Sequence, residues 1–186
     1  MFKNSHLSYG WLAIALHWLS AIVIIGMFIL GLWMVDLDFY NAWYKDAPHY
    51  HKSVGILLAL LIAIRLVAKL MQISPQGVGK RWEQKTAKLV HLLLYLGLFS
   101  LFISGYLIST ADDRGIDIFN WATVPSLGEL FANQEDLAGE IHEWVAYSLI
   151  ALVSLHALAA LKHHFIDKDL TLKRMIKPIN QKKDLS

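Results

Sequence analysis

Four long apolar stretches constrain the fold of this chain more than any other feature of its sequence. Only α-helices and closed β-barrels satisfy their own backbone groups inside a bilayer, and a helix needs ~20 residues to cross the ~30 Å hydrocarbon layer. The stretches therefore predict an all-α membrane protein, built as a bundle of four transmembrane helices. We place the helices at about 11–35, 51–71, 87–109 and 140–162.

The charged residues predict which side of the membrane each connection faces. Of the 17 Lys and Arg, 14 lie in the N-terminus, in the 66–90 connection with its flanking helix ends, and in the C-terminal tail. The acidic residues instead crowd the 36–51 and 110–140 segments. By the positive-inside rule, both termini then face the cytoplasm. Because topology and anionic lipid explain the basic tail, we expect no nucleic-acid partner.

The chain is expected to form a single transmembrane domain over 1–186, with an outer loop at 110–139 and a cytoplasmic basic tail at 163–186. Apolar anchors in the outer loop predict short helices lying over the outer mouth of the bundle. The sequence contains no cysteine, which excludes disulfides, thiolate metal sites and covalent haem attachment.

Two histidines of the fourth stretch are spaced to lie on one face of its helix. His142 and His156 are fourteen residues apart, which at ~100° per residue is 40° short of four full turns and corresponds to ~21 Å along the axis. His51 opens the second stretch on the same outer side as His142. His17 lies about six residues inside the first stretch, at the depth that His156 has in the fourth. The histidines therefore form two pairs at two depths.

A pair of imidazoles on facing helices suits haem, because the two nitrogens can bind one iron from opposite faces of a planar ring in the bundle core. Zinc usually takes three or four protein ligands, and each depth offers two clear histidines. The inner depth also holds His91, so zinc is less excluded there.

Two further residues of the second helix are candidates for contact with such a cofactor. Arg65 follows His51 by fourteen residues and falls on the same face, where a haem propionate would satisfy its charge. The alternative is that its side chain extends to the cytoplasmic interface. Gly55 would let a macrocycle approach the backbone, and its alternative role is helix–helix packing.

With the helices placed, the sequence resembles the bacterial cytochrome b561 family over roughly residues 8–176, a family related to the cytochrome b subunits of nickel–iron hydrogenases and formate dehydrogenases. The motifs that carry the resemblance are LHW at His17, HKSVGILL after His51, HLLLYL from His91, IHEW at His142 and LHALAALKHHFIDKDLTLKRM from Leu155. The resemblance implies a protein of the bacterial inner membrane with two non-covalent b haems. His51 and His142 would hold the outer iron, and His17 and His156 the inner iron.

The function expected from this resemblance is electron transfer across the membrane between a periplasmic redox partner and the quinone pool, ubiquinone or menaquinone. A periplasmic protein or a small-molecule donor would be the partner. A self-sufficient superoxide:ubiquinone oxidoreductase is an alternative, although the acidic outer loop would repel superoxide. The sequence does not decide between a pure electron carrier and an enzyme. An alternative of another class is a haem-free metal transporter.

Three basic residues near the inner pair are candidates for contact with quinone or a propionate. They are His91, His163 and Lys162. A histidine there could also supply the protons that quinone reduction needs, because its pKa lies close to cytoplasmic pH. His91 is also an alternative ligand of the inner iron.

Overall fold

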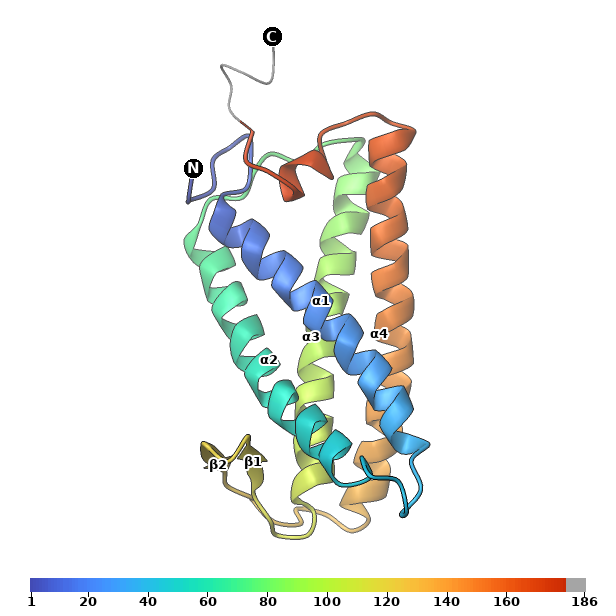
Figure 1. The fold of residues 1–186 in the computed structure, drawn as a ribbon. Helices are drawn as coiled ribbons and strands as arrows, with labels where there is room; N and C mark the ends of the chain where they lie inside the picture. The colour runs from blue at the N-terminus through green and yellow to red at the C-terminus, as the bar shows by residue number, and fades with distance from the viewer. Residues whose placement is uncertain (180–186) are drawn as a thin grey trace. The chain divides into compact units, whose positions relative to one another are not determined.

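The structure is a computed structural model that describes residues 1–179, and it contains four long α-helices and one small β-hairpin (Figure 1). The elements are α1 (Trp11–Val35), α2 (Asp46–Met71), α3 (Arg81–Thr110), β1 (Ile116–Ile118), β2 (Ala122–Val124), α4 (Gln134–Phe165) and a 3₁₀ turn, η1 (Lys173–Met175). All four α-helices are long and apolar enough to cross a membrane. The predicted class, an all-α four-helix membrane protein, is confirmed. Residues 180–186 of the predicted tail lie outside the described residues.

Three of the helices extend beyond the apolar stretches that predict them. Helix α2 begins at Asp46, α3 at Arg81 and α4 at Gln134, each five or six residues before the expected start. Hydropathy marks only the part of a helix that suits lipid. The added turns are largely charged or polar, so hydropathy does not mark them, and the acidic residues in the first turns of α2, α3 and α4 complement the helix dipoles.

Few side chains of the four helices are fully buried. Only 6–11% of the residues in the most apolar window of each helix are buried, and the exposed apolar faces suit contact with lipid. Large aliphatic side chains such as Ile22, Ile29 and Leu155 are accordingly exposed.

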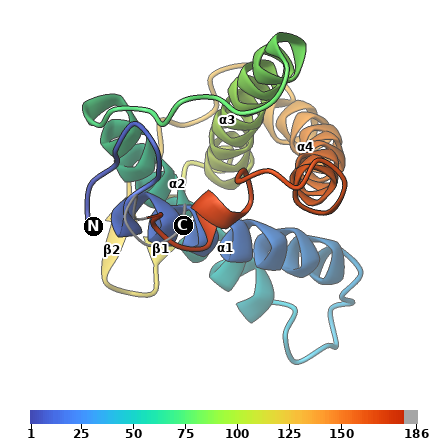
Figure 2. The same cartoon turned by 90° about the horizontal axis from the view of Figure 1, so that it is seen from above.

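The chain divides into two compact units, and each contains segments of all four helices. Unit 1 comprises Met1–Ala21, Leu61–Leu93 and Leu152–Ser186. In this unit the N-terminal segment, the α2–α3 connection and η1 lie over the helix ends (Figure 2). Backbone and side-chain hydrogen bonds join these segments, including Gln76 N to His6 O at 2.9 Å and Ile179 N to Ser8 Oγ at 2.8 Å.

Unit 2 comprises Ile22–Leu60 and Leu94–Ala151 and contains the β-hairpin. Strands β1 and β2 pair antiparallel, with Ile116 opposite Val124 and Ile118 opposite Ala122. The expectation of short helices in this loop is wrong for this segment. Its β-branched residues favour a pleated surface, and the turn places Phe119 and Asn120 at φ of 46° and 62°, in the left-handed region that helices do not use.

A buried serine of α2 fixes the hairpin to the helix. The Ser53 side chain is 0% exposed, and its hydroxyl donates to Asp117 O and accepts from Phe119 N, both at 3.1 Å. A positive φ is unfavourable for a bulky residue such as Phe119. The two hydrogen bonds to Ser53 stabilise the backbone in this conformation.

We expect Ser53→Ala to loosen the hairpin, because the Phe119 amide and the Asp117 carbonyl lose hydrogen bonds that contribute about 0.5–1.5 kcal/mol each. Hydrogen–deuterium exchange of residues 116–124 should become faster, while exchange in α2 stays unchanged. Lys52→Ala, at the exposed neighbouring position, is the control. Equal exchange in both variants would contradict this account of the hairpin.

Candidate functional site

Two histidines face each other in unit 2. His51 of α2 and His142 of α4 have ring centres 6.3 Å apart, and their planes are inclined by 69°. His51 Nδ1 is buried and has no hydrogen-bond partner among the described residues. A buried polar atom without a partner is unfavourable, so this ring is suited to interaction with a further group.

A second pair faces each other in unit 1. His17 of α1 and His156 of α4 have ring centres 6.4 Å apart, with planes inclined by 72°. The two units thus contain the two pairs that the sequence predicts, each drawn from two different helices.

Both spacings fit an iron between opposed imidazoles. Two rings that each bind one metal ion at about 2 Å, from opposite sides, have centres about 6 Å apart. His91 of α3 also approaches His156, but with ring centres 5.2 Å apart, closer than such an opposed pair. The geometry therefore favours His17 over His91 as the partner of His156, and the residues of both pairs fit haem.

Ser104 of α3 orients the His142 ring. Its hydroxyl lies 3.0 Å from His142 Nδ1 and 2.7 Å from Ser100 O. Because the hydroxyl hydrogen goes to the Ser100 carbonyl, the oxygen is left to accept a hydrogen from Nδ1. That tautomer leaves Nε2 with its lone pair, which is the form that binds a metal.

Two glycines that sequence reasoning missed give these rings their space. A Cβ at Gly31 of α1 would lie 3.3 Å from His51 Cε1, and a Cβ at Gly105 of α3 would lie 3.2 Å from His142 Cε1. By contrast, a Cβ at the predicted Gly55 would meet only Met27 Cε, at an ordinary 3.6 Å. Gly31 and Gly105 therefore permit the close approach, and Gly55 packs against α1.

The sequence did contain a signal for these glycines. Fourteen residues separate His17 from Gly31, His51 from Arg65, His91 from Gly105 and His142 from His156. Each of the four helices thus carries two of these residues, separated by the same fourteen positions. Unit 2 receives two histidines and two glycines from this pattern, whereas unit 1 receives three histidines and one arginine.

Arg65 contacts the inner pair directly. Its Nη2 lies 2.8 Å from His17 Nδ1, so the guanidinium donates to that nitrogen. A ring that accepts at Nδ1 carries its hydrogen on Nε2, which is the wrong tautomer for binding iron through Nε2. Ligation by His17 through Nε2 therefore requires Arg65 to turn to another acceptor.

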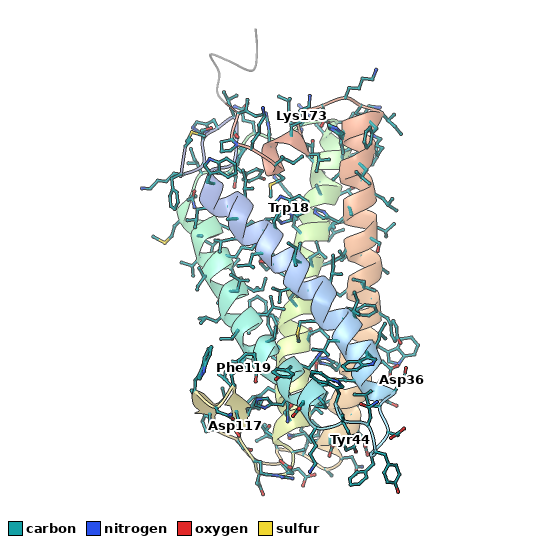
Figure 3. All side chains as sticks on the ribbon, in the orientation of Figure 1. Trp18, Asp36, Tyr44, Asp117, Phe119 and Lys173 are labelled. Atoms are coloured by element: carbon teal, nitrogen blue, oxygen red, sulfur yellow. The ribbon has the colours of Figure 1, made fainter. Side chains whose placement is uncertain are left out.

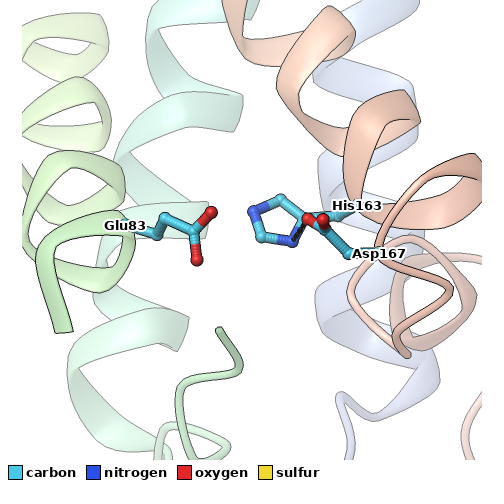
Figure 4. Close-up of side chains that lie close together, drawn as sticks. All are labelled: Glu83, His163 and Asp167. Atoms are coloured by element: carbon cyan, nitrogen blue, oxygen red, sulfur yellow. Dashed lines mark ion pairs between the residues drawn. The ribbon is translucent and has the colours of Figure 1, made fainter. Parts of the chain in front are cut away.

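His163 and Lys162 lie in a network of carboxylates at the end of α4. His163 Nδ1 lies 2.7 Å from Asp169 Oδ2 and 3.1 Å from Asp167 Oδ2, and Figure 4 shows its ring between Glu83 and Asp167. Glu83, His163 and Asp167 offer ligand atoms within 4.8 Å of one another. However, the Lys162 ammonium already lies 2.9 Å from Glu83 and 2.7 Å from Asp167. A cation is therefore already in place, and we assign the cluster as an ion-pair network rather than a metal site.

The environment of Asp169 favours the ionised form of its carboxyl group. Burial raises the pKa of its carboxyl group, but hydrogen bonds from Thr171 and from His163 outweigh that effect and hold the pKa below its ordinary value. Asp169 is therefore a carboxylate at neutral pH and is hydrogen-bonded to His163 Nδ1.

Comparison with known proteins identifies relatives along nearly the whole chain. Residues 8–178 match the family described as prokaryotic cytochrome b561. "Cytochrome b561 homolog 2" of Escherichia coli K12 is 48% identical over 178 residues, covering 94% of each chain. "Cytochrome b561 homolog 1" of the same organism is 31% identical and covers 68% of this chain and 72% of its own. "Probable superoxide oxidase CybB" of Yersinia pestis is 30% identical and covers 92% of this chain and 97% of its own.

We expect Gly31→Ala and Gly105→Ala each to displace an outer histidine ring by a few tenths of an ångström, because the added Cβ would lie 3.2–3.3 Å from the ring. If each histidine pair holds a haem, the midpoint potential of the haem between His51 and His142 should shift and that of the other should stay unchanged. Gly26→Ala and Gly139→Ala are matched controls on α1 and α4, because an added Cβ at either meets nothing within 4 Å. The same shift in the control variants would refute a steric origin.

Proposed function

The chain belongs to the prokaryotic cytochrome b561 family, and from that premise we propose that it carries electrons across the cytoplasmic membrane between an outer redox partner and the quinone pool. Membership makes it a multi-pass protein of the bacterial inner membrane that binds b-type haem and transfers electrons. The alternative of a haem-free metal transporter therefore does not stand. The observation that carries the finer proposal is the presence of two facing imidazole pairs, one in each unit.

In this proposal the protein holds two haems. His51 and His142 would bind the outer iron, and His17 and His156 the inner iron. Haem b supplies reversible one-electron exchange when it is bound. Ser104 holds His142 in the tautomer that can bind iron, and Arg65 is placed to turn from His17 to a propionate.

We place quinone, as ubiquinone or menaquinone, on the inner side. Reducing it requires protons as well as electrons, and His163 is hydrogen-bonded to a carboxylate that retains its charge. Such a histidine can take a proton from solution and pass it on. Lys162 is held by Glu83 and Asp167, which makes it a less suitable direct ligand of quinone than His91.

The charge of the outer segments supports a basic protein as the outer partner. Segments 36–50 and 111–140 carry ten carboxylates but only two basic residues, Lys45 and Arg114. Aromatic side chains are exposed on the same unit, including Tyr44 at 41% and Trp121 at 77%. Figure 3 labels Asp36, Tyr44, Asp117 and Phe119 on these segments. An acidic surface with exposed aromatic rings suits a partner whose basic residues surround an apolar contact.

The second candidate function is superoxide:ubiquinone oxidoreduction. It is favoured by the printed name of the Yersinia pestis relative, which is 30% identical. The acidic outer segments oppose it, because they repel an anionic substrate.

The ionic-strength dependence of haem reduction and oxidation distinguishes the two functions. In liposomes with a ubiquinol analogue, we expect the protein to reduce an added basic c-type cytochrome at a rate that falls as salt rises. A succinylated form of the same cytochrome, with its lysine charges reversed, should react at least tenfold more slowly. Glu129→Gln combined with Glu140→Gln should weaken the salt dependence, and Lys88→Gln should leave it unchanged.

Superoxide should reduce the haems slowly, and salt should accelerate that reaction by screening the repulsion. Fast reduction by superoxide that salt slows, together with no difference between the two cytochromes, would establish the second function instead.

A further inference from the structure

The C-terminal turn η1 is fastened directly beside the candidate inner ligand. Trp18 Nε1, in the residue after His17, donates a hydrogen bond of 2.6 Å to Met175 O. Figure 3 labels Trp18 and Lys173 in this unit. The hydrogen bond places the neighbouring residue, Arg174, close to the same part of α1.

The Arg174 side chain donates one hydrogen bond within the described residues, and its buried Nε has no partner there. The hydrogen bond runs from Nη1 to Gln76 O, at 2.9 Å. It forms no ion pair with a carboxylate of the described residues. A buried donor without an acceptor costs about 1–3 kcal/mol, and more when the group is charged, so the site favours an anion.

A second guanidinium, Arg65, acts on the same small region. Burial raises the pKa of the Tyr9 hydroxyl, and the positive charges of Arg174 and Arg65 both oppose that rise. Both guanidinium groups therefore lie within electrostatic reach of one phenol. Two like charges in a half-buried region repel each other unless an anion lies between or beside them.

We propose that Arg174, together with Arg65, forms a carboxylate-binding site for the two propionates of the inner haem, so that η1 acts as a C-terminal clasp on that cofactor. Haem b carries two carboxylates, which matches two guanidinium groups. A guanidinium offers paired N–H groups that suit a carboxylate. Arg174 would take one propionate through Nε, and Arg65 would take the other after releasing His17 Nδ1. This inference rests on the proposal that His17 and His156 hold the inner haem.

The test compares Arg174→Gln, Arg174→Lys and Lys173→Gln in the full-length protein. Arg174→Gln removes the charge but retains a donor for Gln76 O, and Lys173→Gln removes an exposed charge from the adjacent position. The measurements are the haem content per chain and the midpoint potential of each haem as a function of pH.

We expect Arg174→Gln to keep both haems and to shift the inner potential downward, because loss of a nearby positive charge favours the oxidised iron. A tenfold change in the ratio of oxidised to reduced haem corresponds to 59 mV for one electron. Ionisation of a propionate changes the midpoint potential of the inner haem over a narrow pH range, which we call the pH step. In Arg174→Gln this step should move up by about one pH unit, since the guanidinium favours the ionised form. Arg174→Lys should retain most of the wild-type behaviour, and Lys173→Gln should retain all of it. The outer haem should be unaffected in all three variants.

Reconstitution with haem dimethyl ester assigns the pH step, because esterified propionates cannot ionise. The step should then disappear from the wild type and from Arg174→Gln. The proposed propionate site is refuted if the pH step persists with the ester. It is also refuted if Arg174→Gln leaves both the inner-haem potential and its pH step unchanged. Loss of bound anionic lipid without any change in potential would also overturn it and would assign Arg174 to lipid.

Two further outcomes separate this inference from its premise. If Arg174→Gln loses the inner haem, Arg174→Lys must restore it, and failure to do so overturns the role of the charge. His156→Ala tests the premise by itself, because retention of the inner haem in that variant would remove the proposed ligand pair whatever Arg174 does.

Discussion

The pairing of imidazoles inside apolar helices is the constraint on which the rest of the structure depends. A polar ring in hydrocarbon is unfavourable without a partner, and the four helices carry five such rings, at His17, His51, His91, His142 and His156. The structure brings four of them into two facing pairs with ring centres 6.3 and 6.4 Å apart. One metal ion bound between each pair would satisfy both rings at once. The surrounding glycines, serine and arginine can each be understood through what they do to one of these rings.

The two pairs have different surroundings, which gives each centre its own chemistry. His142 is held by a neutral hydroxyl, and both outer rings lie against glycine. The inner pair has a guanidinium at His17 and a third imidazole near His156. Charge close to a haem changes its potential, and hydrogen bonds to the ligands do so as well. The fourteen-residue pattern thus places two similar histidine pairs in two unlike environments.

The sequence predicted most of the fold and the pairing of the histidines, because both follow from periodicity along single helices. Hydropathy marked four spans, and the spacing of His142 and His156 assigned one residue to each pair. The spacing of Gly31 and Gly105 from His17 and His91 carried the same information, but a glycine has no side chain to suggest a role.

Other features of the site depend on contacts that periodicity does not encode. The tautomer of His142 depends on where the Ser104 hydroxyl points, and the clasp depends on a hydrogen bond between Trp18 and Met175, 157 residues apart in sequence. The sequence does not predict the hairpin in the outer loop, because its apolar anchors also suit helices and the turn at Phe119 requires a backbone conformation that is unusual for an aromatic residue.

The number of haems bound by single-histidine variants tests the central claim most directly. Purified protein should contain two b haems per chain, and His142→Ala and His156→Ala should each contain one, with different potentials for the haem that remains. His91→Ala should retain two haems, because its ring is closer to His156 than an opposed ligand would be. One haem in the wild type, or loss of a haem from His91→Ala with none lost from His156→Ala, would contradict the pairing on which this account rests.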